Sequence, residues 1–349
     1  MKIFVRVDSG TMMGTGHVMR CLTLAKQLRK MKFKIEFITK KLDGNISGLI
    51  KKNGFKIHYI EKPITTKKSQ NKDSKKTIDI IKKNSRISPI LIVDHYKLDF
   101  RWEKKLKSYV KKIIVIDDLA DRKHDCDLLI DQNFYDKLDR RYDKLVQKKT
   151  VKLLGPKYAM LRNEFLSFRK KVKARRKFEK LLISFGGTDP TNETNKVLNS
   201  IKILKNNKIK KINVVIGNTN KNKIKDLCSS IPKVIVYHNI DNIAELMHKS
   251  DFAIGAGGST IWERACLGLP TYVSTVATHQ EESTDALARK KCLINLGKAK
   301  LISKKKYAEI LDDINRKELN KVSQNSLKIV DGKGTIRVAN NIKKIIKLE

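Results

Sequence analysis

The sequence has little that would place the protein outside the cell or in a membrane. Its five cysteines are an odd number with no Cys-x-x-Cys pair, which argues against a disulfide framework or a zinc site. No apolar run approaches the length of a membrane-spanning helix, and no secretory signal precedes the first predicted strand. We therefore expect a cytoplasmic protein without stable membrane insertion.

Acidic and aromatic residues are also scarce. The chain has 36 Asp and Glu against 77 Lys and Arg, a formal net charge of +41, and only 6% aromatic residues. Such a charge is typical of proteins that bind nucleic acid or anionic membranes. Because the lysines are spread along the whole chain and few aromatics could stack on bases, we favour lysine-rich solvated faces and expect no nucleic-acid partner. A module that binds a nucleotide or polyanion without catalysis stays open.

No motif for a metal or a redox cofactor stands out. None of the glycine loops ends in Gly-Lys-Ser/Thr, and none has the G-x-G-x-x-G spacing typical of NAD-binding proteins. The segment Asp125–Asp127 precedes a predicted strand instead of following one, which favours a solvated or structural role over a metal site. We expect neither a cofactor nor a metal ion.

The chain does contain a repeated alternation of apolar runs and helical patterns, which predicts an α/β fold with parallel sheets. Its 349 residues, 40% of them hydrophobic, suffice for two cores. We predict a first domain over 1–152, a connector over 153–179 and a second domain over 180–349 with a helical tail. A lysine-rich surface loop is predicted over 61–76. The predicted strands are 3–7, 33–39, 55–60, 89–93, 112–116, 128–130, 181–185, 212–216, 234–237, 252–254 and 271–273.

The first thirty residues carry the strongest sign of a ligand site. A predicted strand leads into a loop with Gly10, Gly14 and Gly16, which lets the backbone turn sharply and a ligand approach closely. His17 then lies in the first turn of a helix predicted from Val18. Ligands bind at the carboxyl edge of open α/β sheets, and a helix amino terminus disfavours a charged imidazole. We interpret His17 as a neutral general base; the alternative is a histidine that only caps the helix or packs in the loop.

Two further glycine loops occupy the same kind of position in the second half of the chain. Gly186 and Gly187 follow one predicted strand, and the segment 255–260 follows another, each before a helix. Backbone N–H groups in such loops can cradle a phosphate, although a tight turn would also explain either loop alone. Glu263, one turn into the second helix, either binds a ribose diol or is a surface or capping residue.

Eight stretches together carry a resemblance to a known family. They are Arg6–Asp8, Gly14–Arg20, Val93–Tyr96, Ile116–Asp121, His124–Leu129, Gly155–Arg162, Ser184–Pro190 and Gly257–Arg264. With them the chain resembles the nucleotide-sugar hydrolases of pseudaminic acid biosynthesis, the UDP-2,4-diacetamido-2,4,6-trideoxy-β-L-altropyranose hydrolases. The resemblance runs in order from Arg6 to about Gln280, and its most specific part is the run from Asp117 to Leu129.

The resemblance implies a glycosyltransferase-B-like fold, related to that of the transferase MurG, in which two Rossmann-like domains face a cleft. It implies metal-independent hydrolysis in which water attacks the anomeric carbon, UDP leaves and the configuration inverts. His17 then matches the proton acceptor, Tyr96 a sugar-facing tyrosine and Glu263 the nucleotide-binding glutamate. His279 stands where family members can carry Asn, so the acetamido pattern of the sugar is left open. The residues expected to bind substrate are Gly14, Gly16, Arg20, Tyr96, Arg162, Gly186, Gly187, Gly257, Ser259, Thr260, Glu263, His279 and Gln280.

A MurG-like UDP-sugar glycosyltransferase is the alternative enzyme, because it needs the same nucleotide loops. It would also need an acceptor groove and often a membrane-facing apolar patch, and no such patch stands out in the first half of the sequence. We expect a UDP-sugar substrate as the ligand and a monomeric protein.

Overall fold

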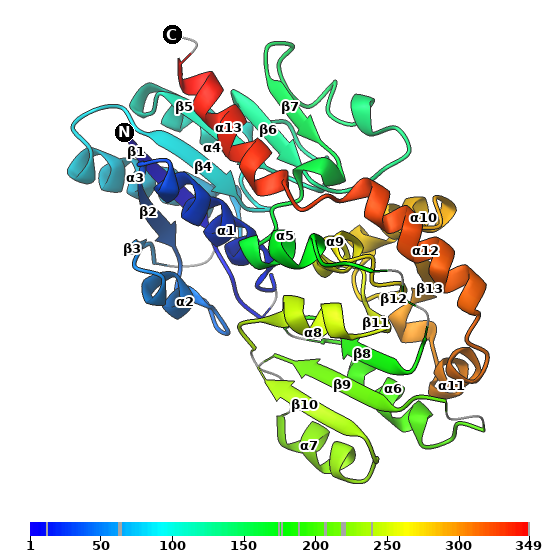
Figure 1. The fold of residues 1–349 in the computed structure, drawn as a ribbon. Helices are drawn as coiled ribbons and strands as arrows, with labels where there is room; N and C mark the ends of the chain where they lie inside the picture. The colour runs from blue at the N-terminus through cyan, green and yellow to red at the C-terminus, as the bar shows by residue number, and fades with distance from the viewer. Residues whose placement is uncertain are drawn as a thin grey trace. The chain divides into compact units, whose positions relative to one another are not determined.

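The computed structural model describes residues 1–11, 13–61, 65–173, 175, 177–187, 189–205, 208–217, 221–238 and 240–347, without the side chains of 221–223 and 225. Met12 and Thr188, which belong to two of the predicted glycine loops, lie outside these residues. The chain divides into two compact units. The first unit comprises Met1–Met160 and Lys333–Glu349, and the second comprises Leu161–Gly332 (Figure 1).

The first unit is a parallel sheet of seven strands with helices between them. The strands are β1 (Lys2–Val7), β2 (Lys34–Thr39), β3 (Lys56–Tyr59), β4 (Ile90–Asp94), β5 (Lys112–Ile116), β6 (Leu128–Asp131) and β7 (Val151–Leu154). The helices are α1 (Gly16–Lys30), α2 (Ser47–Lys52), α3 (Lys67–Asn84), α4 (Phe100–Leu106) and α13 (Gly334–Lys347), with short 3-10 turns η1 (Lys107–Tyr109), η2 (Leu138–Arg140) and η3 (Pro156–Tyr158).

The second unit repeats this architecture with six parallel strands. They are β8 (Lys180–Ser184), β9 (Lys211–Ile216), β10 (Val234–His238), β11 (Phe252–Ala256), β12 (Thr271–Thr275) and β13 (Ile294–Lys298). The helices are α5 (Asn163–Arg169), α6 (Glu193–Ile201), α7 (Lys221–Ser229), α8 (Ile243–Lys249), α9 (Thr260–Cys266), α10 (Glu281–Arg289), α11 (Lys304–Asp312) and α12 (Arg316–Ile329), with 3-10 turns η4 (Thr278–Gln280) and η5 (Ala299–Leu301). None of the helices in the described residues is both long and apolar enough to cross a membrane.

Both sheets have the strand order of a doubly wound Rossmann-like fold. The order is β3-β2-β1-β4-β5-β6-β7 in the first unit and β10-β9-β8-β11-β12-β13 in the second. The order therefore reverses between β1 and β4 and again between β8 and β11, and the crevice beyond the carboxyl ends at such a reversal is the usual ligand site. The predicted fold class, an α/β protein with two Rossmann-like parallel sheets, is confirmed.

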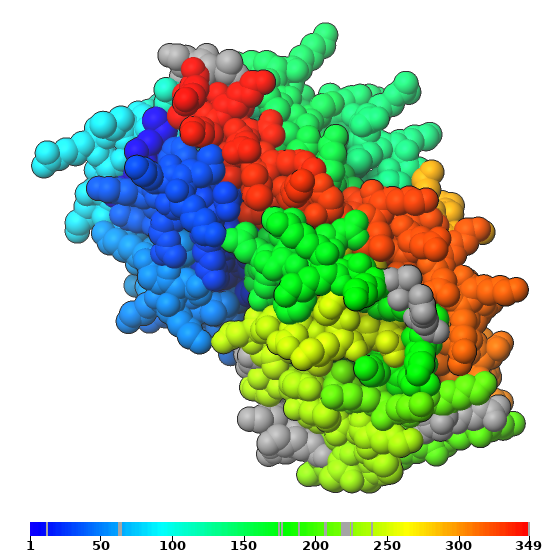
Figure 2. All heavy atoms as spheres, in the orientation of Figure 1, coloured from blue at the N-terminus to red at the C-terminus, as the bar shows by residue number. Residues whose placement is uncertain are grey.

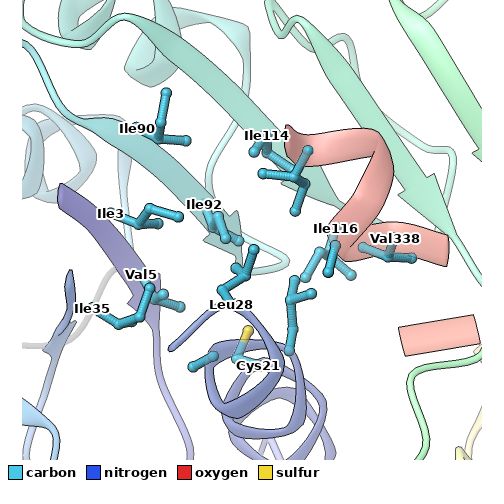
Figure 3. Close-up of a cluster of buried hydrophobic side chains, with 14 of the residues drawn as sticks. Ile3, Val5, Cys21, Leu28, Ile35, Ile90, Ile92, Ile114, Ile116 and Val338 are labelled. Atoms are coloured by element: carbon cyan, nitrogen blue, oxygen red, sulfur yellow. The ribbon is translucent and has the colours of Figure 1, made fainter. Parts of the chain in front are cut away.

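The core of the first unit explains why its first thirty residues fold as predicted. The β-branched side chains of β1 suit a strand that is buried on both faces, and α1 covers it with one apolar stripe. The helical spacing of Val18, Leu22, Ala25 and Leu28 places them on that stripe, and all four are at most 3% exposed. Figure 3 shows Cys21 and Leu28 of α1 pointing among side chains of β1 and β4, with residues of β5 and α13 beside them.

The last helix belongs to the first unit, which differs from the predicted domain boundaries. The amphipathic helix α13 buries Val338, Ile342 and Ile346 in the core that α1 also covers, and its side chains lie beside those of α1 on the surface in Figure 2. Its first residue, Gly334, has no room for a side chain, because a Cβ there would lie 2.2 Å from the carbonyl oxygen of Ala159. The segment predicted to be a connector from residue 153 likewise begins inside β7.

One local prediction is wrong. Residues 67–76, predicted as a surface loop, form the first part of α3, which begins at a capping box between Thr66 and Ser69. Its buried face carries polar residues such as Asp73 and Thr77, so the sequence lacked the apolar period that marks a helix. The region after Gln280 is mostly helical, in keeping with the predicted helical tail, and it also contains the short strand β13.

Aspartates stand at the carboxyl ends of four neighbouring strands in the first sheet. Asp8, Asp94, Asp117 and Asp131 follow or end β1, β4, β5 and β6, and each is at most 1% exposed. A buried carboxylate is costly unless a cation or a hydrogen-bond donor compensates it. The partners of these four groups therefore determine the chemistry at this edge of the sheet.

Asp131 is compensated by a proton. Tyr142 lies between two carboxylates, with its phenol oxygen 3.1 Å from Oδ2 of Asp117 and 3.0 Å from Oδ2 of Asp131. One O–H can donate to only one of them, so the other carboxyl must donate its own proton to the phenol oxygen. Burial and the charges of Asp118 and Asp117 raise the pKa of Asp131 to about 8, so Asp131 is the group that holds the proton.

This proton makes the stability of the first unit depend on pH. Unfolded Asp131 ionises near pH 4, whereas the folded form keeps its proton to about pH 8, so the native state binds more protons between these values. The free energy of unfolding should fall with rising pH there, by up to about 1.4 kcal/mol per pH unit. Asp131→Asn can still donate to Tyr142 but has no proton to lose, so we expect this decline to be removed.

The measurement is urea unfolding at pH 5.5, 6.5 and 7.5, followed by Trp102 fluorescence in a Trp262→Phe background so that only the first unit is reported. The control is Asp143→Asn, the same substitution at an exposed carboxylate paired with Lys152. Equal pH dependence of the native, Asp131→Asn and Asp143→Asn proteins would contradict the assignment.

Candidate functional site

His17 and Asp94 form a hydrogen-bonded pair at the strand-order reversal of the first sheet. His17 lies in the first turn of α1, after β1, and Asp94 is the last residue of β4. Nδ1 of His17 lies 2.6 Å from Oδ1 of Asp94, and the histidine is 4% exposed. Since an ionised carboxylate only accepts hydrogen bonds, Nδ1 must carry a hydrogen, and in the neutral form of the ring Nε2 is then the acceptor.

Arg20 keeps Asp94 ionised. Its Nε donates to Oδ2 of Asp94 at 2.6 Å and its Nη2 donates to Oδ1 at 2.7 Å, a two-point pairing, while Nη1 donates to Asp118 at 2.7 Å. Burial opposes ionisation of Asp94, but the charge and hydrogen bonds of Arg20 outweigh it and hold the pKa of Asp94 well below its usual range. Every nitrogen of the Arg20 guanidinium thus donates to one of two carboxylates, that of Asp94 or that of Asp118.

Tyr96 completes this group of side chains. Its ring meets that of His17 edge to face, with centroids 4.4 Å apart and planes at 82°. Burial and the neighbouring Asp118, which accepts a hydrogen bond from the phenol, raise the pKa of Tyr96 far above its ordinary value. The phenol therefore remains a neutral donor beside the imidazole. The structure thus brings together the predicted residues His17, Arg20 and Tyr96.

His95, the neighbour of Tyr96 in the chain, makes its hydrogen bonds to other groups. Its Nδ1 accepts from the backbone N–H of Lys97 at 3.0 Å, so Nε2 carries the hydrogen and faces Oδ2 of Asp8 at 3.2 Å. Burial and the charge of Arg6 lower the pKa of His95. Both ring nitrogens are occupied, which leaves His17 as the histidine at this edge with an available acceptor nitrogen.

The predicted loop glycines of the first unit lie just before His17. Gly14 has a positive φ of 75° and forms an isolated bridge with Gly10, so the loop closes on itself ahead of α1. Gly16 is the first residue of α1, whose N-cap residue, Thr15, makes no side-chain cap. The loop and the helix start together place the imidazole at the sheet edge.

In the second unit, the loop after β8 satisfies its own helix. Gly186 has a φ of 86°, and Gly187 approaches Gly217 so closely that a Cβ on Gly217 would lie 2.1 Å from the Gly187 oxygen. Asp189 then accepts hydrogen bonds from the N–H groups of Glu193 and Thr194, both at 2.9 Å. The first turn of α6 is therefore capped from within the chain.

The loop after β11 is built differently. Ser259 is the N-cap of α9, which starts at Thr260, and makes no side-chain cap. A Cβ on Gly257 would lie 2.8 Å from Oγ1 of Thr284 and 3.1 Å from Oε1 of Gln280, so the side chains after β12 line this loop. The loop thus leaves its polar backbone groups without a capping side chain and brings predicted residues 257, 259, 260 and 280 together.

Glu263 and Arg162, both predicted to bind substrate, form an ion pair. Nη2 of Arg162 lies 3.3 Å from Oε1 of Glu263, and its Nη1 donates to the Asp241 carbonyl at 3.0 Å. Burial raises the pKa of Glu263, and the charge of Arg162 opposes that rise. His279 lies in η4 and is exposed.

Four residues of the site escaped the sequence analysis. Asp94 and Asp118 end apolar runs that were recognised as strands, so their position at the sheet edge was the available signal. Arg264 and Thr284 could not be found from the sequence, because nothing in the sequence distinguishes a helix residue whose side chain contacts a neighbouring loop from other helix residues. Among the described residues, no group of three or more His, Cys, Asp or Glu side chains is arranged to hold a metal ion.

Comparisons with known proteins relate the chain to sugar-nucleotide enzymes. Residues 181–338 match the family model of the glycosyltransferase family 28 C-terminal domain. An uncharacterized protein of Methanocaldococcus jannaschii is 34% identical over 301 residues, which cover 83% of this chain but only 59% of that protein. The UDP-2,4-diacetamido-2,4,6-trideoxy-β-L-altropyranose hydrolase of Campylobacter jejuni is 28% identical over 292 residues, which cover 83% of this chain and 97% of that protein.

Solved structures share the whole fold at low identity. The MurG of Acinetobacter baumannii aligns with a TM-score of 0.69 and 14% identity, covering 99% of this chain and 100% of its own. Arabidopsis thaliana UGT89C1, complexed with UDP, aligns with a TM-score of 0.68 and 10% identity, covering 98% and 99%. The expected glycosyltransferase-B-like fold is therefore confirmed.

The His17–Asp94 pair makes a prediction about the histidine itself. We expect the neutral His17 ring to carry its hydrogen on Nδ1, whereas Asp94→Asn should make the Nε2–H form the major one. An amide has one acceptor atom and cannot serve both Arg20 and His17, so its N–H₂ group would face Nδ1. The measurement is ¹⁵N NMR of the histidine rings above pH 8.

The matched control is Glu36→Gln, which alters another carboxylate–histidine pair of the same unit, since Glu36 Oε2 lies 2.7 Å from Nε2 of His58. That change should move the His58 signals and leave those of His17 in place. A native His17 with its hydrogen on Nε2 would refute the pairing described above.

Proposed function

We propose that this protein hydrolyses a UDP-sugar at its anomeric carbon. The observation that carries the proposal is the His17–Asp94 pair, a buried histidine with one nitrogen held by a carboxylate and the other available to accept a proton. Support also comes from the similarity along 83% of the chain to a relative named as a UDP-altropyranose hydrolase. The proposed substrate is accordingly UDP-2,4-diacetamido-2,4,6-trideoxy-β-L-altropyranose, in pseudaminic acid biosynthesis.

In the proposed step, a water oxygen attacks the anomeric carbon while the bond from that carbon to the diphosphate oxygen breaks. His17 Nε2 takes the proton that the water loses, and UDP leaves with the electron pair of the broken bond. Asp94 holds the ring in the required tautomer and stabilises the imidazolium that forms, as a carboxylate does behind other catalytic histidines. Attack opposite the leaving group inverts the configuration.

We assign Arg20 a different role from the direct substrate contact expected from the sequence. Its guanidinium donates to Asp94 and Asp118. Arg20 therefore acts by keeping Asp94 ionised and by holding Asp118 beside Tyr96. Tyr96, adjacent to the imidazole, is the proposed contact with the sugar. Gly14 and Gly16 contribute by their backbone, which a side chain would displace from the ligand.

The second unit is proposed to bind UDP. Glu263 would accept hydrogen bonds from the ribose diol, with Arg162 keeping its carboxylate charged against the effect of burial. The loops that carry Gly186 and Gly187 and Gly257, Ser259 and Thr260 would offer N–H groups to the diphosphate. Because Asp189 already caps α6, the loop after β11 is the stronger donor of the two. Gln280 and His279 would lie toward the sugar end.

A UDP-sugar glycosyltransferase is the second candidate. The match of residues 181–338 to a glycosyltransferase domain and the fold shared with MurG favour it. The two candidates use the same nucleotide and base and differ only in whether water or a sugar hydroxyl attacks. Turnover without any acceptor therefore separates them.

The test is incubation with candidate UDP-sugars in ¹⁸O-labelled water, without acceptor and with EDTA, followed by separation of UDP and free sugar. We expect release of UDP, with the label in the sugar and not in the phosphate, because the carbon–oxygen bond breaks. His17→Asn keeps a polar side chain that cannot take the proton, so kcat should fall by about 10²–10⁴-fold. The acidic limb of the pH–rate profile should disappear in the same variant.

Three outcomes would count against the proposal. UDP released only when an acceptor sugar is added would favour the transferase. A folded His17→Asn protein within about threefold of native kcat, well below the smallest usual effect of a general base, would make His17 structural. Loss of turnover in EDTA that magnesium restores would contradict a metal-independent reaction.

The nucleotide half of the proposal has a separate test. Glu263→Ala should raise the Kd of UDP by about tenfold or more, since a hydrogen bond to a charged group is worth roughly 1.5–3 kcal/mol. Isothermal titration calorimetry measures this directly. The control is Glu245→Ala, which removes an exposed carboxylate paired with Lys249 in the same unit and should leave the Kd unchanged. An unchanged Kd in Glu263→Ala would remove Glu263 from the site.

A further inference from the structure

Arg264 is a buried cation without a carboxylate partner, directly beneath the loop after β11. It is 1% exposed. Its Nη2 donates to the carbonyl of Ala256 at 2.7 Å and its Nη1 to Oγ1 of Thr260 at 3.3 Å, whereas its Nε has no hydrogen-bond partner in the described part of the chain. Burial lowers its pKa to about 10, and only the charge of the neighbouring Glu263 opposes this.

The backbone makes room for this guanidinium. A Cβ on Gly255 would lie 2.6 Å from Nη1 of Arg264 and 2.3 Å from the carbonyl oxygen of Ser184. The strand end therefore has a glycine where β11 passes both β8 and the arginine. The Arg264 guanidinium therefore lies at the strand-order reversal without a carboxylate to balance its charge, and a bound anion could balance it.

The hydrogen bond to Ala256 also sets the direction of the next backbone N–H. In a trans peptide the carbonyl and the following N–H point in opposite directions, so holding the Ala256 oxygen turns the N–H of Gly257 away from Arg264. Beside Gly257 lies a second unsatisfied group, the buried hydroxyl of Thr284, which has no hydrogen-bond partner among the described residues. Two unsatisfied polar groups thus flank one short loop.

We propose that Arg264 is a positioning residue for the diphosphate of the nucleotide: it fixes the Ala256–Gly257 peptide so that its N–H faces the anion, and its charge lies behind that N–H. The proposal rests on the binding of UDP by the second unit, proposed above. Arg264 does not touch the ligand in this arrangement. Its effect should therefore be confined to ligands that carry the diphosphate.

Arg175 offers a matched comparison in the same unit. Its side chain is partly buried, and burial likewise lowers its pKa to about 10. Its guanidinium donates to the carbonyls of Ser250, Leu267 and Gly268, which close the ends of α8 and α9. Arg175 is thus a structural arginine whose pKa is lowered as that of Arg264 is, and it lies outside the proposed nucleotide loops. Replacing it should lower stability without selective loss of diphosphate binding.

The experiment compares the affinities of the native protein, Arg264→Met, Arg264→Lys and Arg175→Met for UDP and for uridine, by calorimetry and by competition. We expect Arg264→Met to raise the Kd of UDP at least about tenfold and to change that of uridine less than about twofold, since charge-assisted hydrogen bonds go to the diphosphate. Arg264→Lys, which keeps a charge, should recover most of the loss. Arg175→Met should leave both affinities unchanged.

Each result is decisive. Native UDP affinity in a folded Arg264→Met protein, or equal losses for UDP and uridine, would overturn this inference and leave the proposed function intact. Failure of the native protein to bind UDP would overturn both. If Arg264→Met does not fold, Arg264→Gln decides, because it keeps a donor for Ala256 without the charge: a threefold or greater loss for UDP alone supports the inference, and native affinity overturns it.

Discussion

The ionised carboxylate of Asp94 is the group on which the arrangement of the first unit's site depends. A carboxylate with no exposed surface is tolerated only because Arg20 pairs with both of its oxygens and His17 donates to one of them. The same arginine holds Asp118, and Asp118 in turn holds Tyr96. The tautomer of the histidine, the position of the phenol and the direction of the guanidinium are therefore consequences of one buried charge. This is also why the histidine cannot be considered apart from a residue 77 positions away.

The two units share one strand topology but carry buried charges of opposite sign at the carboxyl ends of their strands. At the reversal of the first sheet the strand ends supply carboxylates, and arginines neutralise them. At the reversal of the second sheet the strand ends supply glycines, and the buried charge is a cation, Arg264, with no carboxylate partner in the described residues. A proton acceptor needs the first environment and an anionic leaving group needs the second. The same backbone architecture thus presents two opposite electrostatic environments, as the proposed reaction requires.

Sequence reasoning succeeded where the relevant physics is local. The apolar run 112–116 predicted β5 with the bounds that the structure has, and the glycines before His17 located the start of α1. It failed where a residue's partner is distant. The buried face of α3 is polar because Asp73 pairs with Arg6, 67 residues away, so the helix lacked an apolar stripe. Asp94 and Arg264 stand in stretches that carried the resemblance but were assigned no role, since their roles depend on contacts that no spacing encodes.

The return of α13 to the first unit has a consequence for biosynthesis. The second unit is continuous in the chain, whereas the first lacks Val338, Ile342 and Ile346 of its core until residues beyond 333 have been made. As the chain emerges from the ribosome, the second unit can close its core while the first still exposes the apolar face that α13 will cover. The first unit, whose synthesis begins first, is therefore completed last. Its exposed apolar face must avoid aggregation for as long as the synthesis of the entire second unit takes.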